Sequence, residues 1–106
     1  VLVTAPPDVA ERLAEALVSE RLAACVGIIP GVRSIYRWQN EMQRDSEALL
    51  LIKTSAALLA CLTERVQALH PYDVPEILAL PIVSGNRSYL NWLSSNLSLP
   101  GCRDAS

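Results

Sequence analysis

The sequence predicts one α+β domain of the split βαβ type, in which two helices cover the same face of a sheet. The order of hydrophobic patterns supports this: strand, helix, strand, strand, helix, strand, and then a short final helix. The chain has 106 residues, of which 51% are hydrophobic and 19% charged. That length and balance suit a single domain with a hydrophobic core of its own.

The first half of the chain supplies the first three elements. Residues 1–4 are apolar and predict a buried strand, and Pro7 suits the first turn of the helix that follows. Apolar residues recur at helical spacing over residues 9–20. Residues 24–38 predict a long strand with an irregularity at Pro30 and Gly31, because proline cannot donate to a ladder and glycine permits a bulge.

The second half supplies the remaining elements. Residues 39–42 predict a polar hairpin loop, and residues 46–54 the return strand. Thr54 or Ser55 is a plausible N-cap for a helix that ends at His70, since the residue before proline leaves the α region. Residues 76–82 predict a strand, 84–86 a turn and 88–97 a short helix. We therefore expect a domain over residues 1–97 and a flexible C-terminal tail over residues 98–106.

The long hairpin indicates assembly with other copies of the chain. Extended at about 3.3 Å per residue, residues 25–38 reach roughly 45 Å. A domain of this size has a radius of gyration of about 13 Å, so the hairpin overruns its own sheet. Its far end carries Ile35, Tyr36 and Trp38, which we predict to lie in an interface of a closed homo-oligomer. The alternative is a hairpin that folds back over its own domain.

Composition excludes several classes of function. The formal net charge is -2 without a basic stripe, which argues against nucleic-acid binding. The apolar runs are too short for membrane insertion. Cys25, Cys61 and Cys102 are an odd set without paired spacing, which fits a reducing compartment such as the cytoplasm, or an organelle if a presequence was removed. No catalytic motif is present, so we do not expect an enzyme.

A set of ordered motifs resembles the CutA divalent-cation-tolerance family over about residues 3–97. The motifs are RLAACV at 21–26, IPGV at 29–32, SIYRW at 34–38, LIKT at 51–54, HPYDVPEI at 70–77, ALPI at 79–82, GN at 85–86 and YLNW at 89–92. The resemblance implies a ferredoxin-like fold in a stable trimer with a PII-like assembly. It also implies a role in copper or other divalent-metal tolerance, and no reaction is firmly attached to the family. A domain of this length builds its core without disulfides or a structural metal, so we expect that no cofactor is required for folding.

His70 is the candidate metal ligand, because it is the only histidine and neutral imidazole binds copper and zinc. The alternative is a structural residue that caps the helix end. In some members of the family a copper site is formed by a cysteine ending the first strand and two adjacent histidines. Here Val3 and Leu69 stand at two of those positions, so the sequence departs from that site.

Four polar residues flank the ends of the central strands and can converge on a cleft between subunits: Lys53, Tyr72, Asp73 and Glu76. Such a cleft would hold a small anion or a metal ion. The alternative is a set of interface ion pairs and hydrogen bonds. Tyr36 and Trp38 can likewise stack on a ligand or pack in the interface.

These observations lead to three alternative hypotheses for the function. The first is a trimeric protein of divalent-metal tolerance that binds metal ions, copper among them, weakly or at subunit interfaces. The second is a PII-like signalling module that binds a small metabolite between subunits. The third is a scaffold for another protein, since the resemblance extends to animal proteins associated with anchoring or processing acetylcholinesterase.

Overall fold

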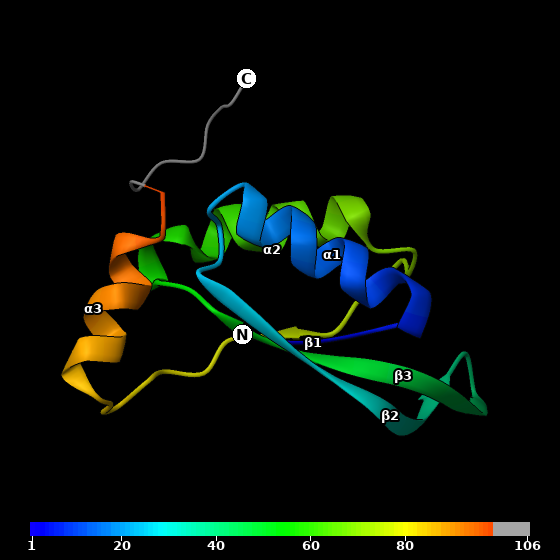
Figure 1. Ribbon diagram of the computed structural model, residues 1–106. Helices are drawn as coiled ribbons and strands as arrows, with labels where there is room; N and C mark the ends of the chain where they lie inside the picture. The colour runs from blue at the N-terminus through cyan, green and yellow to red at the C-terminus, as the bar shows by residue number, and fades with distance from the viewer. Residues whose placement is uncertain (99–106) are drawn as a thin grey trace.

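The computed structural model describes residues 1–98 and confirms the α+β fold (Figure 1). The elements are β1 (Leu2–Ala5), α1 (Pro7–Ser19), β2 (Cys25–Trp38), β3 (Glu41–Lys53), a short 3-10 turn η1 (Ala56–Leu58), α2 (Leu59–Leu69), β4 (Ile77–Leu78) and α3 (Arg87–Ser95). The antiparallel sheet has the strand order β2-β3-β1-β4. The predicted tail lies outside the described residues apart from Ser98, whose N–H donates to the Arg21 carbonyl at 2.9 Å.

The core lies between the sheet and the pair α1 and α2, which cover the same face (Figure 1). Pro7 occupies the first turn of α1, where its missing N–H costs nothing. The helices bury Leu17, Leu62 and Val66 completely against the alternate strand residues Val3 and Leu50. Because strand side chains alternate, Leu2, Leu49 and Leu51 point to the opposite face, which we call the distal face.

The turn of the β2–β3 hairpin is shorter than predicted. Gln39 and Asn40 form it alone, and both have positive φ values, 52° and 67°. Two left-handed residues match the right-handed twist of the flanking strands, as in a type I′ turn. β3 therefore begins at Glu41 and not at residue 46. The sequence pattern missed the first part of β3 because residues 41–45 are polar apart from Met42 and show no apolar alternation.

The predicted irregularity in β2 is confirmed as a β-bulge. Ile29 pairs with Leu49, but the next register pair is Val32 with Glu47, so two residues of β2 oppose one of β3. Gly31 has φ of 79°, a left-handed conformation that glycine adopts without a Cβ penalty. The hairpin continues beyond the bulge, and the largest extent of the molecule is 44 Å with a radius of gyration of 14.5 Å.

The last strand is much shorter than predicted. Only Ile77 and Leu78 pair with β1, whereas residues 76–82 were expected to form a strand. β1 has only four residues, so it offers no backbone partners for strand pairing to residues 79–82. Leu80, Ile82 and Val83 are consequently 61%, 55% and 96% exposed in the single chain.

The cysteines differ from one another in state. Cys25 is a free, half-buried thiol at the start of β2. Cys61 is buried on α2 and is disulfide-bonded, which departs from the reduced cysteines that the predicted reducing compartment implies. Pairing depends on proximity in space, which the spacing of cysteines in the sequence does not show.

Candidate functional site

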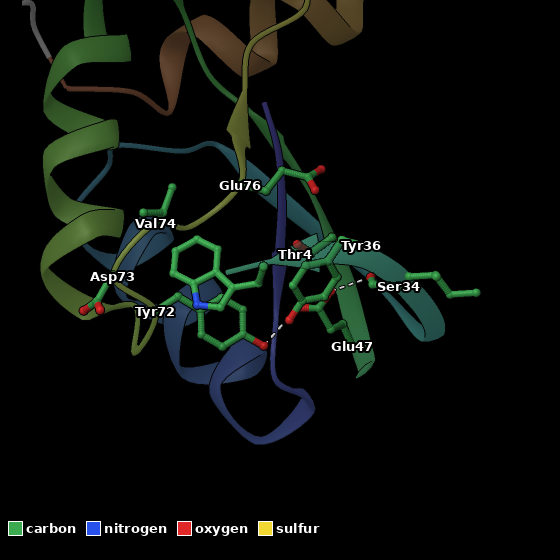
Figure 2. A pocket seen from close by; sticks show the side chains of 10 residues that line it. Thr4, Ser34, Tyr36, Glu47, Tyr72, Asp73, Val74 and Glu76 are labelled. Carbon is green, nitrogen blue, oxygen red and sulfur yellow. Dashed lines mark hydrogen bonds between the residues drawn. The ribbon is translucent and has the colours of Figure 1, made fainter. Parts of the chain in front are cut away.

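A pocket of about 480 Å³ lies on the distal face, where β1, β2 and β3 meet the segment that follows α2. β2 contributes two aromatic side chains and β3 a carboxylate, and residues 72–76, which include Tyr72, form the opposite wall (Figure 2). The lining residues are Thr4, Ser34, Ile35, Tyr36, Trp38, Glu47, Tyr72, Asp73, Val74 and Glu76.

Glu47 is the most deeply buried polar residue of the pocket, with only 3% of its surface exposed. Its Oε1 accepts a hydrogen bond from the Ser34 hydroxyl at 2.5 Å, and its Oε2 accepts one from the Tyr72 phenol at 3.0 Å (Figure 2). An ionised carboxylate accepts on both oxygens, which matches two hydroxyl donors. Within residues 1–98, no lysine or arginine forms an ion pair with Glu47.

The two phenols beside Glu47 are held in their neutral form. Partial burial, the hydrogen bond to Glu47 and the negative charge of that carboxylate raise the pKa of Tyr72 to about 12. The Tyr36 hydroxyl donates to Asp45, and this hydrogen bond is the main reason why the pKa of Tyr36 is raised. Both tyrosines therefore remain hydrogen-bond donors at physiological pH.

His70 fixes the position of Tyr72 and does not line the pocket. Its ring is 7% exposed, Nδ1 accepts from the Tyr72 backbone N–H at 3.2 Å, and Nε2 lies 2.8 Å from the Thr4 carbonyl oxygen. A carbonyl only accepts, so Nε2 carries the proton and the imidazole is the neutral Nε2–H tautomer. A metal ion at Nδ1 would have to displace the Tyr72 N–H.

The structure brings most of the predicted site residues together. Tyr72, Asp73 and Glu76 line the pocket with the predicted interface residues Ile35, Tyr36 and Trp38. Lys53 is the exception in the single chain: it pairs with Cys25 at the far end of β3, and its Nζ donates to the Leu51 carbonyl at 3.3 Å. It lines a separate cavity of about 670 Å³ beside residues 79–82. Its place in a cleft between subunits stays a prediction.

Sequence reasoning missed Ser34, Asp45 and Glu47. The signal for Glu47 was its place directly before the apolar run 48–52, on the same strand face as Leu49. An isolated carboxylate at such a position needs partners in the fold, and hydroxyl groups are suitable ones. The partners themselves come from segments 13 and 25 residues away, which no local pattern reveals.

No group of three or more His, Cys, Asp and Glu side chains is arranged to hold a metal ion in the part of the chain that the structure describes. His70 stands alone as a nitrogen ligand, and both of its ring nitrogens already contact the backbone. Residues 1–98 of one chain therefore supply no ligand set for a metal ion, and metal binding between subunits stays a prediction.

A high pH is expected to weaken the fold through Tyr72. Its pKa is about 12 in the folded chain against 10 for the free side chain, so the folded state favours the neutral phenol. That contribution to stability is complete below about pH 10 and is lost as the pH rises through 12. Urea unfolding between pH 9 and 12 should show a smaller loss in Tyr72→Phe than in the wild type. Equal losses would contradict this role.

Fold and pocket together describe a small α+β domain of split βαβ topology with a pocket on the distal face of its sheet. The pattern of the CutA1 divalent ion tolerance protein family matches residues 1–96, and the chain belongs to this family. It is 61% identical over 97 residues to the divalent-cation tolerance protein CutA of Thermus thermophilus, covering 91% of this chain and 94% of that protein. It is 53% identical to the chloroplastic protein CutA 1 of Oryza sativa and 48% identical to protein CutA of Homo sapiens.

The chain spans 55% of the rice protein and 51% of the human protein. No helix within residues 1–98 is long and apolar enough to cross a membrane. A structure from Archaeoglobus fulgidus is described as a periplasmic divalent cation tolerance protein, while the rice relative is chloroplastic. A cytoplasmic location of this chain therefore stays a prediction.

Solved structures confirm the fold. The Thermus thermophilus divalent cation tolerance protein matches with a TM-score of 0.89 and 59% identity, covering 92% of this chain and 95% of that one. A protein from Nostoc described as a PII-like protein CutA in apo form matches with a TM-score of 0.87 and 34% identity, covering 92% and 95% of the two chains. The PII-like architecture is thus shared by this chain.

Proposed function

We propose that this protein acts as a homotrimer in divalent-cation tolerance, and that it works by binding rather than by catalysis. Membership of the CutA1 family supports the role in tolerance. The observation that carries the assembly is the amount of apolar surface left uncovered by one chain. Ile35 is 62% exposed and Met42 55% on the hairpin, and Leu78 is 53% exposed on β4.

Self-association explains that exposure better than a solvated single chain does. The end of the hairpin projects beyond the helices (Figure 1), and residues 79–83 follow β4 as an apolar segment outside the sheet. Extended segments with free backbone groups and apolar side chains are surfaces for strand pairing between chains. In a closed ring of identical copies, a neighbouring copy covers this surface on each chain, so that none of it stays exposed.

Light scattering on the purified protein tests the assembly. We expect a mass near three times the 11.5 kDa of one chain, unchanged on dilution through the micromolar range. A monodisperse species of single-chain mass would overturn the proposal. A dimer would retain self-association but reject the trimer.

Metal binding is the first ligand proposal, and it includes copper and His70. The wild type and His70→Ala should be titrated with Cu²⁺ and Zn²⁺ by calorimetry on the intact oligomer. We expect weak binding that His70→Ala reduces, together with a change in the hydrogen bond of Tyr72. Tight copper binding that survives His70→Ala would reject His70 as the ligand. Absence of binding would make the link to metal tolerance indirect.

A small-metabolite site of the PII-like kind is the second candidate, because the pocket of about 480 Å³ is of ligand size. A ligand that binds only the folded protein raises its melting temperature. A thermal-shift screen of nucleotides, organic acids and amines should identify a class that stabilises the protein. A screen with no stabilising class would count against this candidate.

A further inference from the structure

We propose that the pocket on the distal face binds an organic cation, through an ammonium or guanidinium group, rather than an anion or a metal ion. The inference deepens the proposed binding function and rests on it. Three observations carry it: a buried carboxylate without a cationic partner, aromatic walls around it, and a lining that contains no basic side chain.

The buried carboxylate is Glu47. Charged groups that are almost completely removed from water are normally paired with an opposite charge or a metal ion. The Ser34 and Tyr72 hydroxyls supply dipoles to its two oxygens but no positive charge. Each carboxylate oxygen has a second lone-pair position. The site therefore has both the charge and the acceptor capacity for a cationic donor.

The other charged residues near the pocket favour a positively charged ligand over a negatively charged one. Asp73 and Glu76 add two carboxylates on the opposite wall, and Lys53, the basic residue once expected here, lies at the far end of the sheet. An anion would meet three carboxylates without a counter-charge, which costs several kcal/mol in a partly buried site. A cation meets the same groups with favourable sign.

Aromatic side chains favour an organic cation over a metal ion. Tyr36 and Trp38 stand two residues apart on one face of β2, 40% and 42% exposed, and Tyr72 lies in the same pocket. Ammonium and guanidinium groups are attracted to such rings within about 6 Å. Hard divalent ions instead need about six oxygen ligands, and no cluster of three ligating side chains exists within residues 1–98.

The same chemical group can come from two sources. One is a small amine or guanidine free in solution, which would enter the open pocket. The other is a lysine or arginine side chain of a neighbouring copy, seated in the pocket when the oligomer forms. Both place a cation against Glu47 and the aromatic rings, so the two sources are distinguished by experiment.

The experiment uses Trp38 as a reporter. The chain has two tryptophans, so Trp92→Phe leaves Trp38 as the only one. The oligomer in this background is titrated with butylammonium and butylguanidinium, and with butyrate and butanol as controls of equal size. We expect saturable changes in Trp38 emission with the two cations alone. Glu47→Gln, which keeps the shape but removes the charge, should weaken binding about tenfold or more.

Matched variants separate the site from the fold. Glu11→Gln, on the exposed side of α1, should leave the affinity unchanged. Trp38→Leu, followed by calorimetry, tests the aromatic wall and keeps the proposal testable should Glu47→Gln fail to fold. Light scattering on every variant reports the assembly separately, so a failed trimer is distinguished from a failed ligand site.

If free cations do not bind but Glu47→Gln raises the dissociation constant of the oligomer about tenfold or more, the cation comes from a neighbouring chain. The cationic class is supported in that case too. Two results overturn the proposal: tighter binding of butyrate than of butylammonium, or no binding of either cation together with an unchanged dissociation constant in Glu47→Gln.

Discussion

Ile35→Lys is expected to dissociate the proposed trimer into single chains at micromolar concentration. Ile35 is 62% exposed in one chain, on the part of β2 that extends beyond the bulge. Covering an isoleucine side chain in an interface contributes about 1.5–3 kcal/mol. The substitution removes this contribution in each of the three copies, so the effect on the assembly is multiplied.

Sedimentation velocity and light scattering on a dilution series would measure this effect. Val18→Lys is the matched control, since Val18 is a β-branched residue 42% exposed on α1, within the helix layer. The control should keep the mass of the wild type. Far-UV circular dichroism should show that both variants retain the fold. An Ile35→Lys protein that stays trimeric would remove the outer hairpin from the interface.

His70→Ala is expected to lower the free energy of unfolding by about 2–4 kcal/mol, because two backbone groups lose their partner. The Thr4 carbonyl loses the Nε2–H donor, and the Tyr72 N–H loses the Nδ1 acceptor. Both contacts fix the position of the segment between the end of α2 and the pocket. Tyr72 should then also be less firmly held against Glu47.

Two partial replacements test each hydrogen bond by itself. The side-chain amide of His70→Gln can donate toward Thr4, and the carbonyl of His70→Asn can accept from the Tyr72 N–H. Each should recover about 1 kcal/mol or more of the loss, measured by chemical unfolding at one fixed protein concentration. A neutral His70→Ala would show that water replaces both contacts and that His70 has another role.

The spacing of apolar residues predicted the helices and strands that bury one face in the core. α1 and α2 followed from apolar spacing, and the bulge followed from Pro30 and Gly31, because these effects are local. Residues 41–45 and 79–82 were assigned wrongly for opposite reasons. Residues 41–45 are polar apart from Met42 yet pair in β3, and residues 79–82 are apolar yet have no partner strand within residues 1–98. Whether a segment pairs as a strand depends on the strand beside it, and the composition of the segment does not identify that strand.

The candidate site was predicted in part. Tyr72, Asp73 and Glu76 are close together in sequence and flank β4, so their shared location was accessible. Glu47 was not, because its importance comes from hydroxyls on β2 and on the segment after α2. Lys53 was grouped with them because it also lies at the end of a strand. That end of β3, however, is the one away from the pocket.

The bulge at Pro30 and Gly31 also sets the phase of side-chain alternation along the outer hairpin. Two residues of β2 opposite one of β3 shift the alternation by one position. This shift directs Ser34, Tyr36 and Trp38, rather than Arg33 and Arg37, to the side of Glu47. If the same chain paired without the bulge, Gly31 would lie opposite Glu47, and Arg33 and Arg37 would present two guanidinium groups on the side of the carboxylate. By taking up one extra residue, the bulge thus decides whether this end of the protein attracts positive charge or neutralises its own carboxylate.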